Sequence, residues 1–479
     1  MCHEDRPFVH LFMCSTGKYL YDVNTDAILR ISDLCYEKMK QNDFTGFEIF
    51  KFREKGYLKS NRVQISEHPA TGILDTYYQS ELHSLTLQIT QQCNLRCEYC
   101  IYSGKYENRK HNDKTMSFEV AKKGIDYIFN HSQNRDRLMF GFYGGEPLLN
   151  YKLIQKIVEY VKNRNVEGKE IEYYMTTNGT LLSDDVIRFL VENDFHLTIS
   201  FDGPQCVHDK MRRYVNNIGT YSDVIKVLMK LKEEYPRYYE NSVDINSVIV
   251  PNDESIKIFD FYRYEDLFKD IWAVNGTLVN DVGYKGMFTK SETFLQAYNY
   301  EYFLVLMARL SRISSKFTST FLEDRFLYVK ELRNCKQRCI ENTLPEKWHH
   351  GGPCIPGEKA LFLSTSGYYY PCERVNETSE NAIIGNVETG VDVNRVRKVI
   401  NVEQYTSEEC RNCWAYRYCH ICVKHICVND RNPKDSILEK CSDIRDSVEE
   451  IFKDYCTMRT LGFDFEVGRV NEGKRRELY

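Results

Sequence analysis

LTLQITQQCNLRCEYC, residues 85–100, is the stretch that decides the fold of this chain. Its first six residues are rich in apolar side chains, which predicts a β-strand. The strand leads into Cys93, Cys97 and Cys100, which have three and then two residues between them. Three thiolates at this spacing can wrap one metal centre in a short loop. A structural zinc ion normally has four protein ligands, whereas a 4Fe-4S cluster held by three cysteines keeps one iron free for a small molecule. We therefore predict a strand followed by an iron–sulfur site with an open iron.

The cysteine spacing, with Tyr99 directly before the last cysteine, resembles the motif of the radical S-adenosylmethionine (SAM) superfamily. This resemblance implies that the unique iron chelates the amino and carboxylate groups of SAM. It also implies that one electron from the cluster cleaves SAM to a 5'-deoxyadenosyl radical. The alternative, three cysteines that only pack in a reduced loop, is disfavoured by the further matches described below.

Length and charge restrict the class of protein. A chain of 479 residues exceeds the usual size of a single core, which predicts two or three domains. Its 64 basic and 69 acidic residues give a formal net charge of -5, which argues against nucleic acid as a partner. No apolar run approaches the roughly 20 residues of a membrane span, and residues 1–6 do not resemble a signal peptide. We expect a cytoplasmic protein without a membrane partner.

Eighteen cysteines in a cytosolic chain are better explained as metal ligands than as disulfides, because that compartment keeps thiols reduced. Three belong to the first motif and eight lie in the last 126 residues. Among the seven scattered cysteines, Cys335 and Cys339 lie four apart on an expected helix, and their role stays open between metal binding and an incidental position.

Residues 1–75 are expected to form a small module of their own. Three segments rich in aromatic and β-branched residues precede two helical patterns, and an extended segment starts at Gly56. The strands are expected at 8–13, 19–23 and 27–31, and the helices at 32–40 and 44–55. This order is similar to the winged-helix-like recognition module of peptide-modifying radical SAM enzymes, which binds a leader peptide by adding a strand to its sheet edge. The alternative is a domain that only caps the barrel.

A linker is expected at 62–83, and strands then alternate with helices up to about residue 279. The strands are expected near 85–90, 138–143, 171–176, 196–201, 243–250 and 270–274, and the helices near 117–131, 150–164, 183–193, 220–234 and 253–267. This alternation predicts an α/β fold with a parallel sheet and right-handed crossovers. Six such units resemble the partial (β/α)6 TIM-like barrel of radical SAM enzymes, in which active residues lie at the carboxyl ends of the strands.

Further motifs fall at those strand ends. A Gly-Gly-Glu-Pro turn follows the second strand and resembles the family motif that is assigned to the SAM amino group. The resemblance assigns Ser200 to the SAM ribose and Arg212 to its carboxylate. The expected cofactor-binding residues are Tyr99, Gly144, Gly145, Glu146, Pro147, Asn178, Ser200 and Arg212. The sequence assigns no catalytic acid or base; Tyr143, Glu146 and Asp202 are candidates because they lie near the expected site, and the alternative for each is that it only orders its loop.

The cysteine-rich end resembles the SPASM domain, which carries two auxiliary clusters. Cys354 and Cys372 flank a predicted hairpin around Gly367, and the resemblance assigns both to the proximal cluster. It assigns Cys410, Cys413, Cys419 and Cys441 to the distal cluster. The family places three residues between the position of Cys419 and its next cysteine, whereas here two residues separate Cys419 from Cys422 and seven separate it from Cys427. The next proximal ligand is therefore ambiguous between these two.

This ambiguity leaves two roles open for the proximal cluster. With three protein cysteines its open iron could bind a substrate thiolate, and with Cys335 or Cys339 as a fourth ligand it would relay electrons. The alternative for the whole cysteine-rich end is a zinc-ribbon scaffold.

The resemblance implies a peptide maturase with SAM and three 4Fe-4S clusters. The expected reaction is thioether formation in a ribosomally made, cysteine-rich precursor peptide that carries a leader sequence. The expected electron donor is a protein such as flavodoxin or ferredoxin. The surplus electron is expected to leave through the auxiliary clusters. Alternatives are epimerisation, carbon–carbon cyclisation, anaerobic sulfatase maturation, and a non-enzymatic iron–sulfur electron-transfer protein. The expected domains are the recognition module at 1–75, the barrel at 76–284, a helical bridge at 285–350, the SPASM domain at 351–445, and a helix and tail at 446–479.

Overall fold

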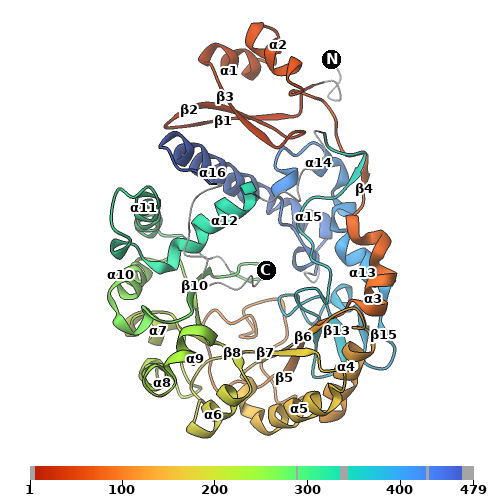
Figure 1. Cartoon of the computed structure of the whole chain (residues 1–479), viewed down its shortest axis with the longest axis vertical. Helices are drawn as coiled ribbons and strands as arrows, with labels where there is room; N and C mark the ends of the chain where they lie inside the picture. Colours follow the sequence, from red (N-terminus) through yellow and green to blue (C-terminus); the bar gives the residue numbers. More distant parts are fainter. Residues whose placement is uncertain (1–5, 287, 289, 335–342, 428–430, 466–479) are drawn as a thin grey trace.

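The computed structural model describes residues 6–286, 288, 290–334, 343–427 and 431–465. Figure 1 shows the N-terminal sheet at one end of the molecule and the barrel strands with their helices at the other, with the long helix α16 (Cys441–Thr460) beneath the N-terminal sheet. Within these residues no helix is both long and apolar enough to span a membrane.

Six parallel strands form the barrel, as the sequence predicts. They are β5 (Ser84–Thr90), β6 (Arg137–Gly144), β7 (Glu170–Thr177), β8 (Phe195–Ser200), β9 (Val243–Ile249) and β10 (Ala273–Leu278). They lie side by side in sequence order. The last strand begins three residues later than expected, and its second half is exposed. The alternation of strands and helices was therefore a sound guide to this part of the fold.

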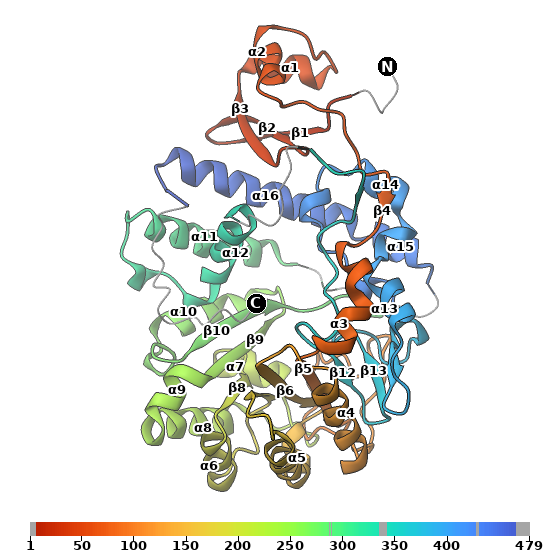
Figure 2. The same ribbon diagram turned by 45° about the vertical axis from the view of Figure 1, so that its right-hand side comes forward.

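Helices cover the outer face of these strands (Figure 2). The predicted ones are α4 (Phe118–Asn130), α5 (Tyr151–Arg164), α6 (Asp184–Glu192), α8 (Tyr221–Glu234) and α10 (Lys257–Tyr264). In α4 the side chain of Ser117 caps the first turn, and Ala121, Ile125 and Ile128 are buried on one face. Two short helices were not predicted, α7 (Gln205–Met211) and α9 (Pro236–Ser242). Each has seven residues, too few to show a helical period clearly.

The cysteine-rich end continues the barrel sheet. The predicted hairpin is present as β12 (Phe362–Leu363) and β13 (Tyr368–Tyr370), with Gly367 at φ +80 in the turn. Strand β12 pairs in parallel with β5, and β14 (Gly385–Asn386) and β15 (Gly390–Val391) complete the sheet order β10-β9-β8-β7-β6-β5-β12-β13-β14-β15. This extension was not predicted, because strands of two or three residues show no period.

The N-terminal module has the predicted elements. An antiparallel sheet contains β1 (Val9–Cys14), β2 (Gly17–Asp22) and β3 (Ala27–Ile31), and two helices follow, α1 (Asp33–Lys40) and α2 (Phe47–Glu54). The helices cover one face of the sheet and α16 covers the other (Figure 1). The extended segment expected from Gly56 is not a strand. Leu58 has φ +62, and its N–H donates to Asp22 Oδ2 at 2.6 Å.

The expected linker at 62–83 is wrong, because this segment is folded. Strand β4 (Ile65–Ser66) pairs with β11 (Lys347–Trp348), and α3 (Leu74–Ser80) buries Leu74, Tyr77 and Tyr78 in the main core. The Pro and Gly residues that suggested a linker lie in a short 3-10 turn, Pro69–Ile73, directly before α3. Helix α3 crosses the expected domain boundary at residue 75.

The remaining helices connect the barrel to the cysteine-rich end. The expected helical bridge contains α11 (Glu292–Arg309) and α12 (Glu323–Asn334). Cys335 and Cys339 lie outside the described residues, so their role stays open. The last region contains α13 (Val393–Ile400), α14 (Ser407–Arg411), α15 (Pro433–Leu438) and α16.

Candidate active site

The first cysteine set lies at the carboxyl end of β5, as predicted. Backbone N–H groups of Leu95 and Tyr102 donate to the sulfur atoms of Cys93 and Cys100, each at 3.4 Å. Burial raises the pKa of Cys93 and that of Cys97 to about 12. It also raises the pKa of Cys100, against the charges of nearby arginines. Buried thiols of this kind lose their protons when a metal binds. The donor set therefore fits a thiolate-bound metal group.

The two glycines after β6 make room for the start of the cysteine loop. A Cβ atom on Gly144, which has φ +148, would lie 2.2 Å from the carbonyl oxygen of Thr90. One on Gly145 would lie 1.9 Å from the carbonyl oxygen of Gln92. The N–H groups of Gly145 and Glu146 donate to these same two oxygens at 2.8 Å. The glycine turn therefore supports the backbone that carries Cys93. The assignment of this turn, including Pro147, to SAM stays a prediction.

Glu146 connects two strand ends from a fully buried position. Its carboxylate accepts hydrogen bonds from Leu148 N at 3.1 Å, Thr177 Oγ1 at 2.8 Å and Asn178 N at 2.8 Å. Burial raises the pKa of Glu146 to about 7, in spite of these donors. Asn178 Nδ2 in turn donates to Asn94 Oδ1 at 2.8 Å and lies 4.0 Å from Cys93 Sγ. Glu146 thus fixes Asn178 beside the first cysteine set, and both of its oxygens are occupied by protein groups.

Asp202 holds Tyr99 and Arg212 together in the core of the site. Its Oδ2 accepts hydrogen bonds from Tyr99 OH and from Arg212 Nε, the latter at 2.9 Å, and its Oδ1 accepts one from Val248 N at 2.9 Å. The guanidinium carbon of Arg212 lies 5.3 Å from the centre of the Tyr99 ring. Burial raises the pKa of Tyr99 well above its ordinary value. Asp202 is therefore engaged as an anchor for these two side chains.

Ser200 and Tyr143 occupy strand ends, as expected. Ser200 is the last residue of β8 and is buried opposite Asn246 of β9. Tyr143 lies near the end of β6 and packs against Phe362, with ring centres 6.3 Å apart. Burial, and the charge of Glu373, raise the pKa of Tyr143. The structure places both residues at the carboxyl ends of the barrel strands, as predicted, and their roles stay predictions.

The predicted distal set surrounds a cavity. A space of about 230 Å³ is lined by residues that include all four predicted cysteines, Cys410, Cys413, Cys419 and Cys441. One water needs about 30 Å³ in the liquid, so a much larger group fits here. Burial raises the pKa of Cys410 to about 12 and that of Cys419 still further. The residues present fit a thiolate-bound cluster.

The proximal set is brought together around Cys422. Burial raises the pKa of Cys372 and that of Cys427 to about 12, and in both the nearby Cys422 contributes to the rise. Cys354 contributes in the same way to the raised pKa of Cys422. Cys422 therefore lies near each of the other three cysteines.

Four residues beside the first cysteine set were missed by sequence reasoning. His111 Nε2 lies 3.6 Å from Cys100 Sγ. Tyr102 stacks against the guanidinium of Arg109, which is paired with Glu377 at 3.0 Å. No motif marks these residues, and Arg109 and Glu377 are 268 positions apart in the chain.

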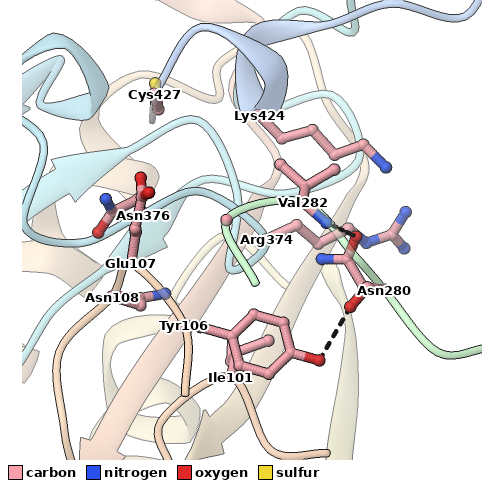
Figure 3. Close-up of a pocket in the computed structure, with 11 residues that line it drawn as sticks. Ile101, Tyr106, Glu107, Asn108, Asn280, Val282, Arg374, Asn376, Lys424 and Cys427 are labelled. Atoms are coloured by element: carbon pink, nitrogen blue, oxygen red, sulfur yellow. Dashed lines mark hydrogen bonds between the residues drawn. The ribbon is translucent and has the colours of Figure 1, made fainter. Parts of the chain in front are cut away.

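A small cavity lies where three segments meet (Figure 3). It has a volume of about 30 Å³ and is lined by the loop 101–108, by Asn280 to Gly283, and by Arg374, Asn376, Lys424 and Cys427. Tyr106 OH donates to the carbonyl oxygen of Asn280 at 2.9 Å, which ties the barrel loop to the end of β10. The cavity therefore lies between the barrel and the proximal cysteines.

Comparison with known proteins agrees with this geometry. Residues 87–261 match the Radical SAM superfamily. The chain is 32% identical over 192 residues to the serine-type anaerobic sulfatase-maturating enzyme of Bacteroides thetaiotaomicron. This alignment covers 40% of this chain and 44% of that protein. It is 24% identical over 352 residues to the cysteine-type anaerobic sulfatase-maturating enzyme of Clostridium novyi, and this alignment covers 71% of this chain and 86% of that protein. The chain spans about half the length of the curated relatives with which it shares at least 30% identity.

A solved structure has the same fold over most of its length. Native anSMEcpe with bound AdoMet and a peptide superimposes with a TM-score of 0.55 at 19% sequence identity, covering 78% of this chain and 99% of that one. The matched residues 87–261 contain the second half of β5, the strands β6 to β9 and the first cysteine set. With this motif at the end of β5 and six parallel strands beside it, this part of the chain is similar to the radical SAM superfamily.

Proposed function

We propose that the chain modifies a peptide by SAM-dependent radical chemistry and that the product is a thioether cross-link within a ribosomally made, cysteine-rich precursor. The observation that carries the proposal is the joining of two cysteine sets in one sheet. Strand β5 leads to Cys93, and β13, two strands away in the same sheet, leads to Cys372. Strand β13 runs antiparallel to β5, so the two sets lie towards opposite ends of these strands, and a peptide bound along the inside of the sheet would lie between them.

The proposed cofactor ligands follow from the three sets. Cys93, Cys97 and Cys100 would hold the SAM-binding 4Fe-4S cluster. The distal auxiliary cluster would use Cys410, Cys413, Cys419 and Cys441, and the proximal one Cys354, Cys372 and Cys422. When bound, the first cluster and SAM supply hydrogen-atom abstraction from an unactivated carbon. Cys427 is left as a neighbour of the proximal set, because its thiol also bonds to Ser379.

The chain's own residues hold this site in place. Asp202 keeps Tyr99 and Arg212 fixed beside Cys97, and Glu146 keeps Asn178 fixed beside Cys93. The predicted SAM contacts of Ser200 and Arg212 belong to this proposal. In the peptide, one carbon–hydrogen and one sulfur–hydrogen bond break and one carbon–sulfur bond forms. The peptide gives up one hydrogen atom to the SAM-derived radical, and one proton and one electron besides.

The N-terminal module is the proposed site for the leader of the precursor. Among the described residues β3 pairs with β2 alone, so its other edge can accept a strand. Exposed apolar side chains lie on the adjoining helices, with Leu34 69%, Phe47 73% and Phe50 57% exposed. The hydrogen bond from Ser32 to Glu48 brings the starts of both helices close to the end of β3. The proposed electron donor is a reductant such as flavodoxin or ferredoxin, and the proposed location is the cytoplasm.

Sulfatase maturation is the second candidate, because named sulfatase-maturating relatives align over 86% and 89% of their lengths. The test is mass spectrometry after anaerobic incubation of the reconstituted chain with SAM, a strong reductant and either the precursor encoded beside the gene or a sulfatase-derived peptide. A loss of about 2 mass units per event, with loss of an alkylatable thiol, supports the thioether. The same mass loss with all thiols alkylatable indicates a carbon–carbon link. Modification of the sulfatase peptide alone overturns the proposal in favour of the second candidate.

A further inference from the structure

A hairpin at residues 213–219 packs directly against the loop that carries the first cysteine set. Arg96 N donates to Arg213 O at 2.7 Å, and Val215 N donates to Asn94 O at 3.3 Å. Both are backbone hydrogen bonds, and they attach the hairpin to the segment between the first two cysteines. The outer surface of the hairpin is therefore also the outer surface of the cysteine loop.

The alternation of side chains along this ribbon defines a face that points to solvent. Leu95 pairs with Tyr214 in an antiparallel bridge, and Leu95 is buried. Because neighbouring residues of a strand point to opposite faces, Arg96, Arg213 and Val215 share the other face. Arg96 is exposed, and Val215 is 64% exposed. This outer face is open to a partner.

Two guanidinium groups on the outer face have no carboxylate partner within the described residues. Arg96 Nη1 donates to the carbonyl oxygens of Cys93 and Leu95, both at 2.7 Å. Arg213 donates from Nε to a backbone carbonyl oxygen at 2.6 Å and from Nη1 to Asn217 Oδ1 at 3.0 Å. All of these acceptors are neutral. Both positive charges are therefore left for an external anion or an acidic surface.

The acidic side chains around the hairpin already have partners. Glu98 pairs with Lys105, and Glu254 pairs with Lys210. Asp209 is half-buried, and its carboxylate accepts a backbone N–H at 2.8 Å. The face thus keeps a positive surplus in a chain whose formal net charge is -5. A local surplus of this kind favours and steers an acidic partner.

The tip of the hairpin adds apolar surface to this charge. Val215 and Ile218 are 64% and 60% exposed. A single exposed aliphatic side chain needs no explanation, but here two lie within one four-residue tip beside unpaired guanidinium groups. An apolar centre with a charged rim, in which arginine is enriched, is typical of protein interfaces. The hairpin therefore has the composition of a small docking surface.

The position of this surface indicates which partner it suits. The proposed reaction consumes one electron for each cleavage of SAM, and an external carrier must deliver it to the first cysteine set. Arg96 and Cys97 are adjacent, so their Cα atoms are about 3.8 Å apart. Flavodoxin is an acidic one-electron carrier whose flavin exposes its apolar dimethylbenzene edge. Its charge and its redox edge match the two properties of the hairpin.

We propose that Arg96 and the hairpin 213–219 form the docking surface for flavodoxin. The flavin edge lies against Val215 and Ile218, and carboxylates around it pair with Arg96 and Arg213. In the transfer the reduced flavin loses one electron, and the cluster proposed at the first cysteine set gains it. This inference rests on the proposed function, because it names the surface through which the same site receives its electron.

The test measures the Kd of a bacterial flavodoxin for the reconstituted full chain by anaerobic calorimetry. V215D and R213E each place a negative charge on the outer face. Both should raise the Kd at least about fivefold at low salt, because they repel an acidic partner. The difference from the wild type should shrink at about 300 mM salt, where charges at this distance are screened.

A matched variant and a second reductant serve as controls. Val166 is 83% exposed and lies before β7, at the opposite edge of the barrel strands, so V166D should keep the wild-type Kd. Dithionite is a small reductant that needs no docking surface. With dithionite, 5'-deoxyadenosine formation should change less than about twofold in all three variants. With flavodoxin, the half-saturating concentration should rise in V215D and R213E in step with the Kd.

Three results would overturn the inference. The first is a wild-type Kd with wild-type salt dependence in both V215D and R213E. The second is an equal loss of dithionite-driven and flavodoxin-driven cleavage, which would assign the hairpin to support of the cysteine loop. The third is reduction by a ferredoxin when flavodoxin neither binds nor reduces the chain.

The failure of this inference differs from the failure of the proposed function. Peptide modification with dithionite, without any binding of flavodoxin, would refute the docking surface alone. Flavodoxin binding that V215D and R213E weaken, without modification of the precursor, would refute the proposed peptide chemistry and leave the docking surface standing.

Discussion

Arg417→Met should loosen the loop that carries the distal cysteines. Arg417 lies between Cys413 and Cys419, is 7% exposed, and donates from Nε to the carbonyl oxygen of Val23 at 2.6 Å and from Nη2 to that of Asn24 at 2.7 Å. A hydrogen bond from a charged donor contributes about 1.5–3 kcal/mol, so loss of two should cost about 3–6 kcal/mol. Methionine retains much of the apolar stem and removes only the donors.

The expected result is a lower urea midpoint together with loss of about four irons per chain after anaerobic reconstitution, because the distal cluster loses its support. Arg395→Met is the control, since Arg395 is 52% exposed and donates to Ile383 O at 3.1 Å from the surface. It should change the unfolding free energy by less than about 1 kcal/mol. Full iron content and wild-type stability in Arg417→Met would refute the idea that the N-terminal module supports the distal site.

This contact changes how the leader-binding proposal must be tested. His10 of β1 stacks on Trp414, with ring centres 3.7 Å apart, and Tyr418 OH donates to Asp26 at 2.7 Å. Deleting residues 1–75 would therefore remove the support of the distal loop as well as the β3 edge. A point change such as Phe47→Ser, at a side chain that is 73% exposed, separates the two effects.

Three other changes test the site and its surroundings. Cys93→Ala should abolish 5'-deoxyadenosine formation, whereas Cys410→Ala should retain some cleavage and lose product; undiminished product in Cys410→Ala would contradict the auxiliary role. Glu146→Ala should lower the free energy of unfolding by about 3 kcal/mol or more in a urea titration, because three buried donors lose their acceptor. The control is Glu192→Ala at an exposed position, which should change the free energy of unfolding by less than about 0.5 kcal/mol in the same titration. Burial raises the pKa of Asp244 from 3.8 to about 7, so the folded state binds more protons than the unfolded state and stability falls as pH rises through this range. Between pH 5.5 and 8 the free energy of unfolding should fall by roughly 2 kcal/mol because of Asp244, and Asp244→Asn should remove this fall. An unchanged pH dependence of stability in Asp244→Asn would contradict the raised pKa of Asp244.

The barrel was predictable because its signals are local. Each strand of β5 to β9 is long enough to show its apolar pattern, and each is followed by a helix with its own period. The first cysteine set was recognisable for the same reason, since its three members lie within eight residues, and the metal-binding role of all three sets stays a prediction. Residues 62–83 were misjudged because Pro69 and Gly72 interrupt the pattern, although Leu74, Tyr77 and Tyr78 pack in the core.

What the sequence could not supply is pairing over long distances. The Arg109–Glu377 ion pair and the β5–β12 pairing each join segments more than 250 residues apart, and no local pattern marks either one. The choice between Cys422 and Cys427 depends likewise on how two loops meet. For Glu146 and Asp202 the sequence left open whether the carboxylate contacts a ligand or only orders its loop, and in the structure each one accepts hydrogen bonds from protein groups.

The continuity of the sheet bears on how the two halves of the site work together. Because β12 pairs with β5, the edge of the strand that carries the first cysteine set is covered by the cysteine-rich domain. Gln88 of β5 and Arg109 both bond to Glu377, which lies five residues after Cys372. A truncated barrel would expose the β5 edge and leave a buried arginine without its carboxylate, at a cost of several kcal/mol. Loss of SAM cleavage in such a truncation would therefore reflect a damaged barrel, and point substitutions of the auxiliary cysteines are the informative experiment.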